Sequence, residues 1–260
     1  MKYLIVDLDD TLLSKDKTVS EYARKGIESL RKLGFLFVFN TARSLAASQK
    51  WIEDLRPDYA ILNAGGMICD GDQNILYKKE ISIADTNYIT GELMKDESIR
   101  LFSVQTADRL ISKEVRSEAH WLKYDYFDFL SDLNEPAMKI MMTSEISDRW
   151  EQMAKDMGYE FERYFDGTWF RISSSNKYKG NQALFELLGD TTPMDYVFGD
   201  DHGDVEMIQN AYYGALLKNS RLLDMAEHIT EYSCDEDGVI RHMEKLLGLK
   251  LLALEIEDEL

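Results

Sequence analysis

The chain has 260 residues, of which 45% are hydrophobic, and a formal net charge of −18. This length suits a single domain, or a domain with a second one inserted into it. The acidic balance argues against a nucleic-acid partner or an anionic membrane surface, because both need a basic face. A small anionic substrate stays compatible with it, since a metal ion and a few cations can reverse the field inside one pocket.

The two cysteines, Cys69 and Cys234, lie far apart and have no nearby partner. We therefore expect neither a disulfide framework nor a zinc site. The first apolar run is broken by Asp7, which is not typical of a signal peptide. No apolar stretch approaches the roughly 20 residues of a membrane span. The sequence predicts a cytoplasmic protein that is not bound to a membrane.

The first part of the chain alternates between strand and helix patterns. Buried strands are predicted at Tyr3–Val6, Phe35–Phe39 and Tyr59–Leu62, with helices between them. The first helix begins at a capping box formed by Thr18 and Glu21 and ends before Gly34. This spacing is typical of a parallel sheet with helical crossovers.

The pattern changes in the middle of the chain. We expect a hairpin from residue 67 to 77, a helix over 82–97, a strand over 139–143, a helix over 147–157 and a strand pair over 159–172. The aromatic stretch over 114–134 has weak periodicity and could line a pocket or form part of a core. Because antiparallel strands dominate here, the segment is predicted to be a separate α+β domain covering residues 73–173.

The first pattern returns afterwards. A helix follows Lys179, strands are predicted at Tyr196–Phe198, Tyr213–Leu217 and Ile229–Tyr232, and a helix over 239–247 closes the pattern. Residues 1–72 and 174–260 are thus expected to form one core domain. The predicted fold class is α/β, with a doubly wound, Rossmann-like parallel-sheet core and an inserted α+β cap domain.

Polar side chains collect where the predicted core strands end. Asp7 and Asp9 follow the first strand and can face one pocket, because side-chain direction repeats every second residue. Carboxylates held so close repel each other unless a cation or a shared proton relieves them. An aspartate in such a place can also be only a turn or helix-cap residue.

Further groups of this kind appear later in the chain, and they decide between these readings. Thr41 and Arg43 follow the second strand, Lys179 opens a helix, and Asp200 and Asp204 follow a later strand. Carboxylate oxygens suit Mg²⁺, and lysine and threonine donate to phosphate oxygens. Positioning and charge neutralisation are what phosphoryl transfer requires, and an aspartate can serve as its nucleophile.

Taken together, these stretches resemble the haloacid dehalogenase-like (HAD) hydrolase superfamily, and most closely its Cof-type sugar-phosphate phosphatase branch. That branch carries a large cap of the C2 type between its second and third motifs. The matching stretches, in family order, are Asp7-Leu8-Asp9-Asp10-Thr11, Thr41, Lys179-Gly180 and Gly199-Asp200 through Asp204. Asn219 after the next strand is a further, weaker feature of the family.

The resemblance implies a role for each matched position. Asp7 would be the nucleophile and a Mg²⁺ ligand, and Asp9 the general acid and base, with its backbone carbonyl on the metal. Asp200 would bind Mg²⁺ directly, and Asp204 would bind it or orient the lysine. The remaining matched residues would contact the phosphoryl group or the substrate: Thr41, Arg43, Lys179 and Asn219.

The chain departs from the usual pattern of this branch at three places. Ala42 replaces a glycine between the threonine and arginine of the second motif. Gly203 replaces an asparagine in the fourth motif, and the third strand ends in Asn63-Ala64-Gly65-Gly66 instead of Asn-Gly-Ala. No catalytic carboxylate is lost, so the departures concern metal geometry and substrate contacts.

The expected reaction is Mg²⁺-dependent hydrolysis of a small phosphorylated metabolite by a monomer or homodimer. A phosphomutase that uses the same aspartyl-phosphate is one alternative. A receiver-like signalling module is another, although a receiver phosphorylates an aspartate after the third strand, where this chain has Asn63. We expect His202, which lies inside the fourth motif, to be an exposed loop residue, because Asp9 already fills the proton-transfer role.

Overall fold

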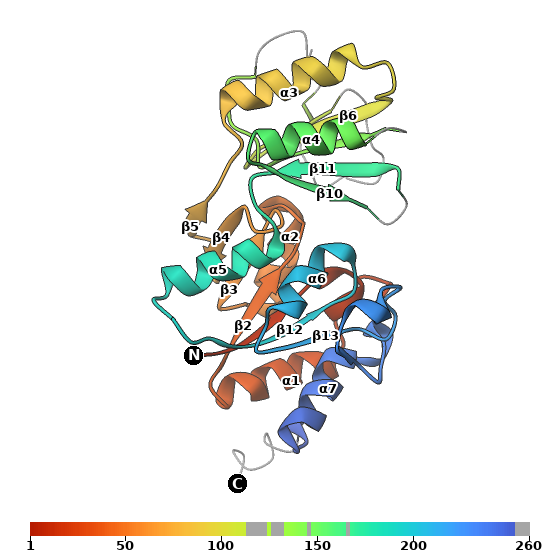
Figure 1. Ribbon diagram of the computed structural model, residues 1–260. Coiled ribbons are helices and arrows are strands. Elements are labelled where there is room, and N and C mark those ends of the chain that lie inside the picture. The colour runs from red at the N-terminus through yellow and green to blue at the C-terminus, as the bar shows by residue number, and fades with distance from the viewer. Residues whose placement is uncertain (113–123, 126–132, 145–146, 165–166, 253–260) are drawn as a thin grey trace.

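The computed structural model describes residues 1–112, 124–125, 133–144, 147–164 and 167–252. Within them the chain forms a core with an eight-stranded sheet and a cap with a six-stranded sheet, stacked one above the other (Figure 1). The predicted fold class, a Rossmann-like core with an inserted α+β cap, is therefore confirmed.

The core sheet is parallel over most of its width. Its strands, in spatial order, are β14 (His228–Ile229), β13 (Tyr213–Leu216), β12 (Met194–Gly199), β1 (Lys2–Val6), β2 (Phe35–Asn40), β3 (Tyr59–Leu62), β4 (Met67–Asp70) and β5 (Ile75–Lys78). From β14 to β3 all neighbours pair in parallel, whereas β4 and β5 are antiparallel. Since β1 lies between β12 and β2, the carboxyl ends of these strands meet at one place.

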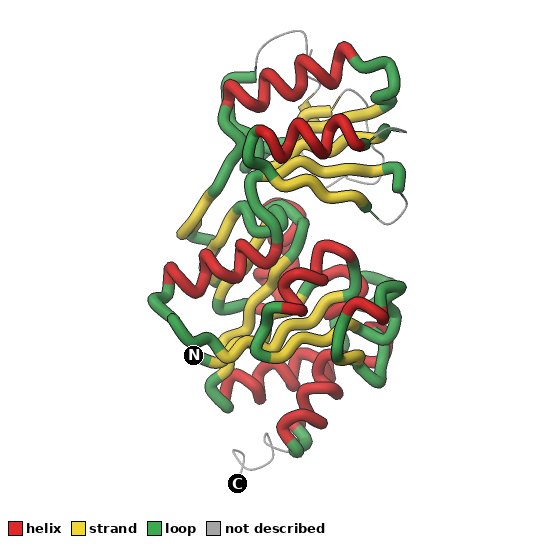
Figure 2. Tube along the Cα trace, viewed as in Figure 1, coloured by secondary structure: helices red, strands yellow, loops and turns green. Residues whose placement is uncertain are grey.

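Helices cover both faces of the core sheet, as Figure 2 shows. One face carries α1 (Glu21–Lys32), α2 (Leu45–Leu55) and α7 (Gly238–Leu247), and the other carries α5 (Lys177–Leu187) and α6 (His202–Gln209). The central strand shows why both faces are apolar. Leu4 and Val6 pack into the first helix layer, whereas Tyr3 and Ile5 pack into the second. Alternation along a strand thus gives the sheet two buried faces.

The cap is a second sheet with helices on one face. Its strand order is β10 (Glu160–Arg163), β11 (Trp169–Ser173), β9 (Lys139–Thr143), β6 (Leu101–Gln105), β7 (Leu110–Ser112) and β8 (Tyr124–Asp125). All described neighbours are antiparallel except β7 and β8. The helices α3 (Ile83–Lys95) and α4 (Asp148–Asp156) lie against this sheet, where Ile89 and Trp150 pack with Met142 and Phe170.

The chain crosses between core and cap at two adjacent places. The predicted hairpin exists, but β5 pairs with β4 in the core sheet, so the first crossing follows Lys78 and not residue 73. The return follows β11, which ends at Ser173. The Ser174 hydroxyl donates a hydrogen bond to the Lys79 carbonyl, which ties the two crossings together. Most of the aromatic stretch over 114–134 lies outside the described residues.

Candidate active site

A cavity of about 330 Å³ opens between the carboxyl ends of the core strands and the cap. The core side is lined by Asp7, Asp9, Asp10, Thr41, Ala42, Arg43, Lys177, Asp200, Asp201 and Gly203, and the cap side by Lys139, Glu162, Tyr164 and Arg171. The strand-end residues predicted from the first, second and fourth motifs are therefore brought together. Their convergence follows from the parallel order of β2, β1 and β12.

Asp7 ends β1 and is only 6% exposed. Its carboxylate Oδ1 lies 2.9 Å from the Lys177 Nζ, and the same ammonium lies 2.6 Å from Oδ1 of Asp204. Burial raises the pKa of Asp7 well above its usual value; Lys177 opposes this rise, and the nearby carboxylates of Asp204 and Asp200 add to it. Asp7 is thus a buried carboxylate whose negative charge calls for a further cation.

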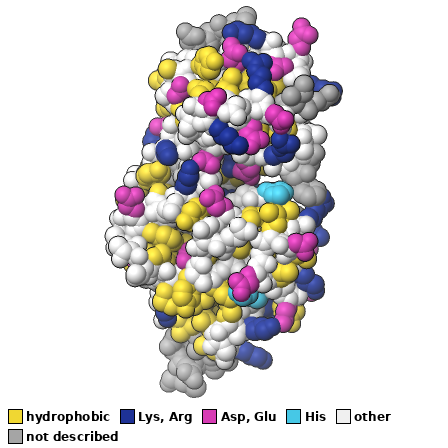
Figure 3. Space-filling model, in the orientation of Figure 1, with side chains coloured by type: hydrophobic (Ala, Val, Ile, Leu, Met, Phe, Trp, Pro, Cys, Tyr) yellow, Lys and Arg dark blue, Asp and Glu magenta, His cyan; other side chains and the backbone are white. Residues whose placement is uncertain are grey.

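The lysine beside Asp7 is Lys177 and not the predicted Lys179. Lys179 carries a side chain that is 47% exposed and pairs with Glu160 of the cap. On the face shown in Figure 3, acidic and basic side chains intermingle where the cap meets the core. Residues two apart on a helix point about 200° apart, so only one of these lysines can face the cavity. The third-motif assignment is therefore corrected to Lys177.

The start of α5 is held in place by contacts with the ends of β2 and β3. The Asn40 side chain donates to the Lys177 carbonyl at 2.8 Å and to Oδ1 of Asn181 at 2.7 Å. Gly65, with a φ of +90°, lies so close that an added Cβ would stand 2.0 Å from the Asn176 carbonyl oxygen. The glycine-rich segment after β3 therefore packs directly against the start of α5 and positions the helix that carries Lys177.

Asp9 lies in the irregular turn η1 (Leu8–Leu12) after β1, where Asp10 adopts a left-handed φ of +55°. The Arg43 guanidinium binds the Asp9 carboxylate in a bidentate manner, with Nε 2.6 Å from Oδ2 and Nη2 2.7 Å from Oδ1. Lys17 lies 3.1 Å from the same group. Burial alone would raise the pKa of Asp9, but Arg43 and Lys17 together hold it below its usual value. In this arrangement Asp9 is an ionised, clamped carboxylate.

The fourth motif places two carboxylates beside Asp7. One oxygen from each of Asp7, Asp200 and Asp204 lies within 4.8 Å of the others. Burial and the neighbouring Asp204 raise the pKa of Asp200 to about 7, although a hydrogen bond from Thr11 opposes the rise. Asp204 is fully buried, and its Oδ2 accepts from the backbone N–H groups of Asp200 and Asp201 at 3.0 Å. Asp204 therefore shapes the loop and also orients Lys177.

This carboxylate group fits a small divalent cation. Hard oxygen ligands close together are what Mg²⁺ prefers, and the ion usually completes its shell with water and phosphate oxygens. Burial is the main reason that the pKa values of Asp7 and Asp200 are raised, and the neighbouring carboxylates add to it, so a cation bound here would stabilise the ionised forms. The Asp9 carboxylate does not join the group, because Arg43 and Lys17 hold it.

The remaining predicted contacts divide between two cavities. Thr41 is buried at the end of β2 and lines the main cavity together with Arg43. Asn219 instead lines a neighbouring cavity of about 480 Å³ that shares Asp10, Asp200 and Asp201 with the first. Its amide donates to the Asp10 carbonyl at 2.8 Å and accepts from the Cys234 backbone N–H at 2.8 Å. Asn219 therefore stabilises the turn after β1 by linking Asp10 to Cys234.

The sequence offered only the aromatic stretch over 114–134 as a cap segment that could line a pocket, and most of it lies outside the described residues, whereas Lys139, Glu162, Tyr164 and Arg171 of the cap line the cavity. The only sequence signal was a single charged residue in each of the otherwise uncharged strands β9 and β11, Lys139 and Arg171. Their position over the core depends on how the cap sits, which no local pattern encodes.

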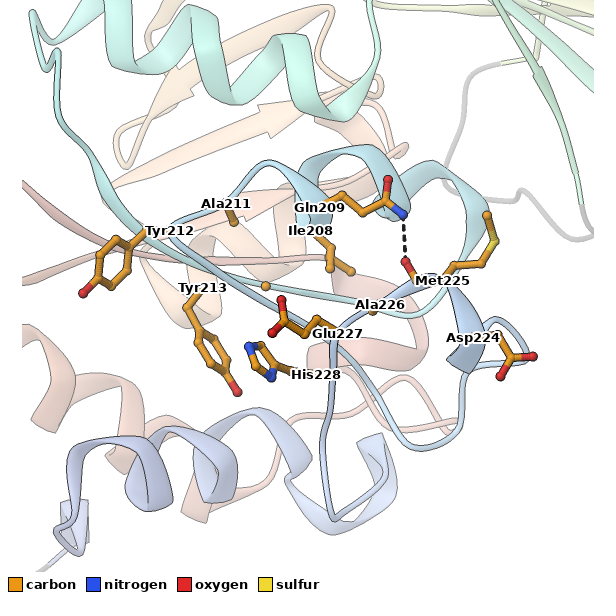
Figure 4. Close-up of a pocket in the computed structure, with 11 residues that line it drawn as sticks. Ile208, Gln209, Ala211, Tyr212, Tyr213, Asp224, Met225, Ala226, Glu227 and His228 are labelled. Atoms are coloured by element: carbon orange, nitrogen blue, oxygen red, sulfur yellow. Dashed lines mark hydrogen bonds between the residues drawn. The ribbon is translucent and has the colours of Figure 1, made fainter.

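A separate cavity of about 430 Å³ lies at the far edge of the core sheet (Figure 4). Tyr213 and His228 stack there with ring centroids 4.5 Å apart, and Gln209 bridges to the Met225 carbonyl at 2.8 Å. It shares no lining residue with the main cavity. Among the described residues, no helix is long and apolar enough to cross a membrane.

Known proteins resemble this chain over most of its length. Residues 4–243 match the family of haloacid dehalogenase-like hydrolases. The 5-amino-6-(5-phospho-D-ribitylamino)uracil phosphatase YcsE of Bacillus subtilis is 24% identical, covering 93% of this chain and 95% of the relative. An uncharacterized protein of Mycoplasma capricolum is 25% identical, covering 93% of this chain and 99% of the relative.

Solved structures share the fold over nearly the whole length. The HAD subclass IIB sugar phosphatase BT4131 superposes with a TM-score of 0.78 at 16% identity, covering 95% of this chain and 99% of the other. A haloacid dehalogenase-like hydrolase of B. subtilis gives a TM-score of 0.78 at 19% identity, covering 95% and 100%.

The chain belongs to the haloacid dehalogenase-like hydrolase family. The predicted family and its Cof-type branch are confirmed, and so is the prediction of an enzyme of the HAD phosphatase class.

Proposed function

We propose that this protein is a Mg²⁺-dependent phosphatase that hydrolyses small phosphate monoesters through a phospho-aspartate on Asp7. The observation that carries the proposal is the environment of Asp7. It is a buried carboxylate with an ammonium at 2.9 Å, Lys177, and two further carboxylates, Asp200 and Asp204, within 4.8 Å. A nucleophile, a phosphate-binding cation and metal ligands thus share one cavity.

The proposed reaction has two steps. First, an Asp7 oxygen attacks phosphorus, the ester P–O bond breaks, and the leaving alkoxide takes a proton from Asp9. Water then attacks the aspartyl-phosphate, gives a proton to Asp9, and inorganic phosphate leaves. Lys177 and Thr41 hold the phosphoryl oxygens during both steps. The acid role of Asp9 requires the Arg43 clamp to loosen when substrate binds, because the clamp favours the ionised form.

Mg²⁺ would be held by Asp7 and Asp200, with Asp204 and the Asp9 backbone carbonyl completing the proposed protein ligands. When bound, it would neutralise charge on the phosphoryl group and the surrounding carboxylates. Lys177 still has its own task, because its ammonium counters the buried charges of Asp7 and Asp204. Of the two lysines at the start of α5, Lys177 is the one that pairs with the proposed nucleophile Asp7.

We propose a sugar phosphate or a related metabolite as the substrate. The cavity volume of about 330 Å³ suits a small molecule, and the cap closes its upper side with polar side chains. A relative of similar length is named as a phosphatase of a phosphorylated ribitylaminouracil, and a structural neighbour as a sugar phosphatase. Both names describe small phosphate monoesters, which is the class proposed here.

The test is phosphate release from p-nitrophenyl phosphate and from a panel of phosphorylated metabolites, with Mg²⁺ and with EDTA. Wild type is expected to be active only with the metal. Asp7→Asn should lose at least roughly 10³-fold in kcat, as expected for removal of a nucleophile. Lys179→Ala, a change on the surface of the same helix, serves as the matched control and should retain activity. Full activity of Asp7→Asn would refute the mechanism.

A further inference from the structure

The cap contributes three charged side chains to the cavity, Lys139 from β9, Glu162 from β10 and Arg171 from β11. Their neighbours in the strands, Ile140 and Phe170, pack on the other side among the cap helices. Because side chains alternate along a strand, the charged residues occupy the helix-free face of the cap sheet. This face forms the roof of the cavity above Asp7.

The strand register sets these three side chains beside one another. Glu162 lies directly opposite Arg171 across the β10–β11 pair, and Lys139 lies on the diagonal to Arg171 across β9 and β11. Arg171 is 2% exposed and forms an ion pair with Glu162. Glu162 in turn reaches the core, since a Cβ on Gly203 would stand 2.9 Å from its Oε1. The glycine that departs from the family pattern thus leaves room for this cap carboxylate.

The charges on the roof are not balanced. Glu162 forms an ion pair with Arg171. Lys139, in contrast, has no carboxylate within 4 Å among the described residues, and its ammonium donates to the Ala42 carbonyl at 2.6 Å. Burial and the neighbouring Arg171 lower the pKa of Lys139 to about 7, with Glu162 opposing them. The Nε of Arg171 is buried and has no hydrogen-bond partner within the described part of the chain. Although the protein has a net charge of −18, the cap side of the cavity thus carries, as far as the structure describes the chain, an ammonium without a carboxylate partner, on Lys139, and an N–H donor without an acceptor, on Arg171.

We propose that Lys139 and Arg171 form a second anion subsite, so that the preferred substrates are phosphate monoesters whose leaving alcohol carries another acidic group, a carboxylate or a second phosphate. This inference rests on the proposed phosphatase function. An acidic group would neutralise the Lys139 ammonium and accept from Arg171, whereas a hydroxyl would leave the charge unanswered. Sites that present buried polar groups reject analogues lacking the partner by large factors.

Matched substrate pairs test the proposal with the full-length protein and Mg²⁺. The pairs are 6-phosphogluconate with glucose 6-phosphate, 3-phosphoglycerate with glycerol 3-phosphate, and fructose 1,6-bisphosphate with fructose 6-phosphate. We expect kcat/KM for the acidic member of at least one type to exceed that of its neutral partner about tenfold or more, mainly through KM. The first two pairs report a carboxylate preference and the third a preference for a second phosphate.

Variants separate the subsite from general damage to the cap. Lys139→Met should bring the ratio within each pair close to one, and Lys139→Arg, which keeps the charge, should retain the preference. Lys179→Ala, which lies outside the cavity, should leave the wild-type ratio intact. Gly203→Asn, whose Cβ would lie 2.9 Å from the flexible Glu162 carboxylate, should also change the ratio. Thermal unfolding of each variant shows whether it is folded.

Binding to Asp7→Asn, measured by calorimetry with the same pairs, makes the result independent of turnover. Equal binding of acidic and neutral members, or a preference that survives Lys139→Met, would overturn the subsite while the phosphatase proposal stands. Absence of phosphate release from every substrate would overturn the proposed function, and the calorimetric preference would then still decide the subsite.

Discussion

Lys177 and Lys179 are two positions apart at the start of α5, yet only Lys177 reaches the nucleophile. The approach of the carboxylates could be predicted, because the carboxyl ends of parallel strands meet at one edge. The choice of lysine could not. The helix follows Ser173-Ser174-Ser175-Asn176, and each of these residue types is a good N-cap. Only the fold shows that Asn176 is the cap, accepting from the Lys179 backbone N–H.

Substitution of these lysines should therefore have very different effects. Lys177→Met is expected to lower kcat by about 10²-fold or more, because the phosphoryl group and Asp7 lose their cation. It should also destabilise the fold by about 3 kcal/mol or more, since buried carboxylates are left unpaired. Lys179→Ala should change kcat less than about twofold, because exposed ion pairs contribute little. Steady-state kinetics and urea unfolding of both variants check this, and equal losses would contradict the Lys177 assignment.

Asp195 offers a pH test away from the site. It lies in β12, is 6% exposed, and accepts from the Tyr212 backbone N–H at 2.9 Å. Burial raises its pKa, against the opposing effect of backbone hydrogen bonds. The folded state therefore binds the carboxyl proton of Asp195 more tightly than the unfolded state does. The stability that this proton contributes is lost as the pH rises above about 3.9, the ordinary pKa of an aspartate side chain.

Asp195→Asn removes that proton while keeping an acceptor for Tyr212. Relative to wild type, the free energy of unfolding of the variant should thus increase between pH 4.5 and pH 7.5. Urea titrations at both values give the difference directly. A difference that stays constant or shrinks with pH would show that Asp195 is not held in its protonated form.

At the scale of elements, the local patterns predict what a segment is better than where it belongs. The turn after β3 and the β4–β5 hairpin could be recognised from turn residues and alternation. That β5 continues the core sheet depends on its pairing with β4, and β4 pairs with β3. Similarly, Lys139 and Arg171 are single charged residues in the otherwise uncharged strands β9 and β11, but nothing local in the sequence says that they cover Asp7. Non-local packing decides both, and it places Gly65 against the start of α5.

Two glycine substitutions test that packing. Gly65→Ala should destabilise the protein by about 3 kcal/mol or more, because an added Cβ would meet backbone at 2.0 Å and φ is +90°. It should also lower activity, since the helix start that carries Lys177 must shift. Gly91→Ala, inside α3 with open space around it, should instead stabilise by about 0.5–1 kcal/mol. Urea unfolding of both compares the contact with helix propensity alone.

At the scale of the whole molecule, the crowded carboxylates link metal binding to stability. Asp7, Asp200 and Asp204 converge from segments almost 200 residues apart in the sequence, so the group exists only in the folded chain. A ligand that binds only the folded state raises its stability by mass action. Saturating Mg²⁺ should therefore raise Tm relative to EDTA, by several degrees for a chain of this size.

Asp200→Asn separates this effect from general ionic strength. The variant keeps an acceptor for Thr11, removes one of the crowded charges, and should unfold at a higher temperature than wild type in EDTA. It should lose most of the rise caused by Mg²⁺. Asp72→Asn, at an exposed position in a distant turn, is the control and should respond to the metal like wild type. A full metal response in Asp200→Asn would exclude Asp200 as a ligand.

The adjoining crossings between core and cap have a consequence for how such a protein can change. The Ser174 hydroxyl donates a hydrogen bond to the Lys79 carbonyl, so the inserted segment leaves and re-enters the core at almost the same point. A segment with neighbouring ends can be exchanged for another, or shortened to a few residues, without reordering the sheet beneath it. The residues at the ends of the core strands would then keep their positions, while a different insert would determine which substrates reach them.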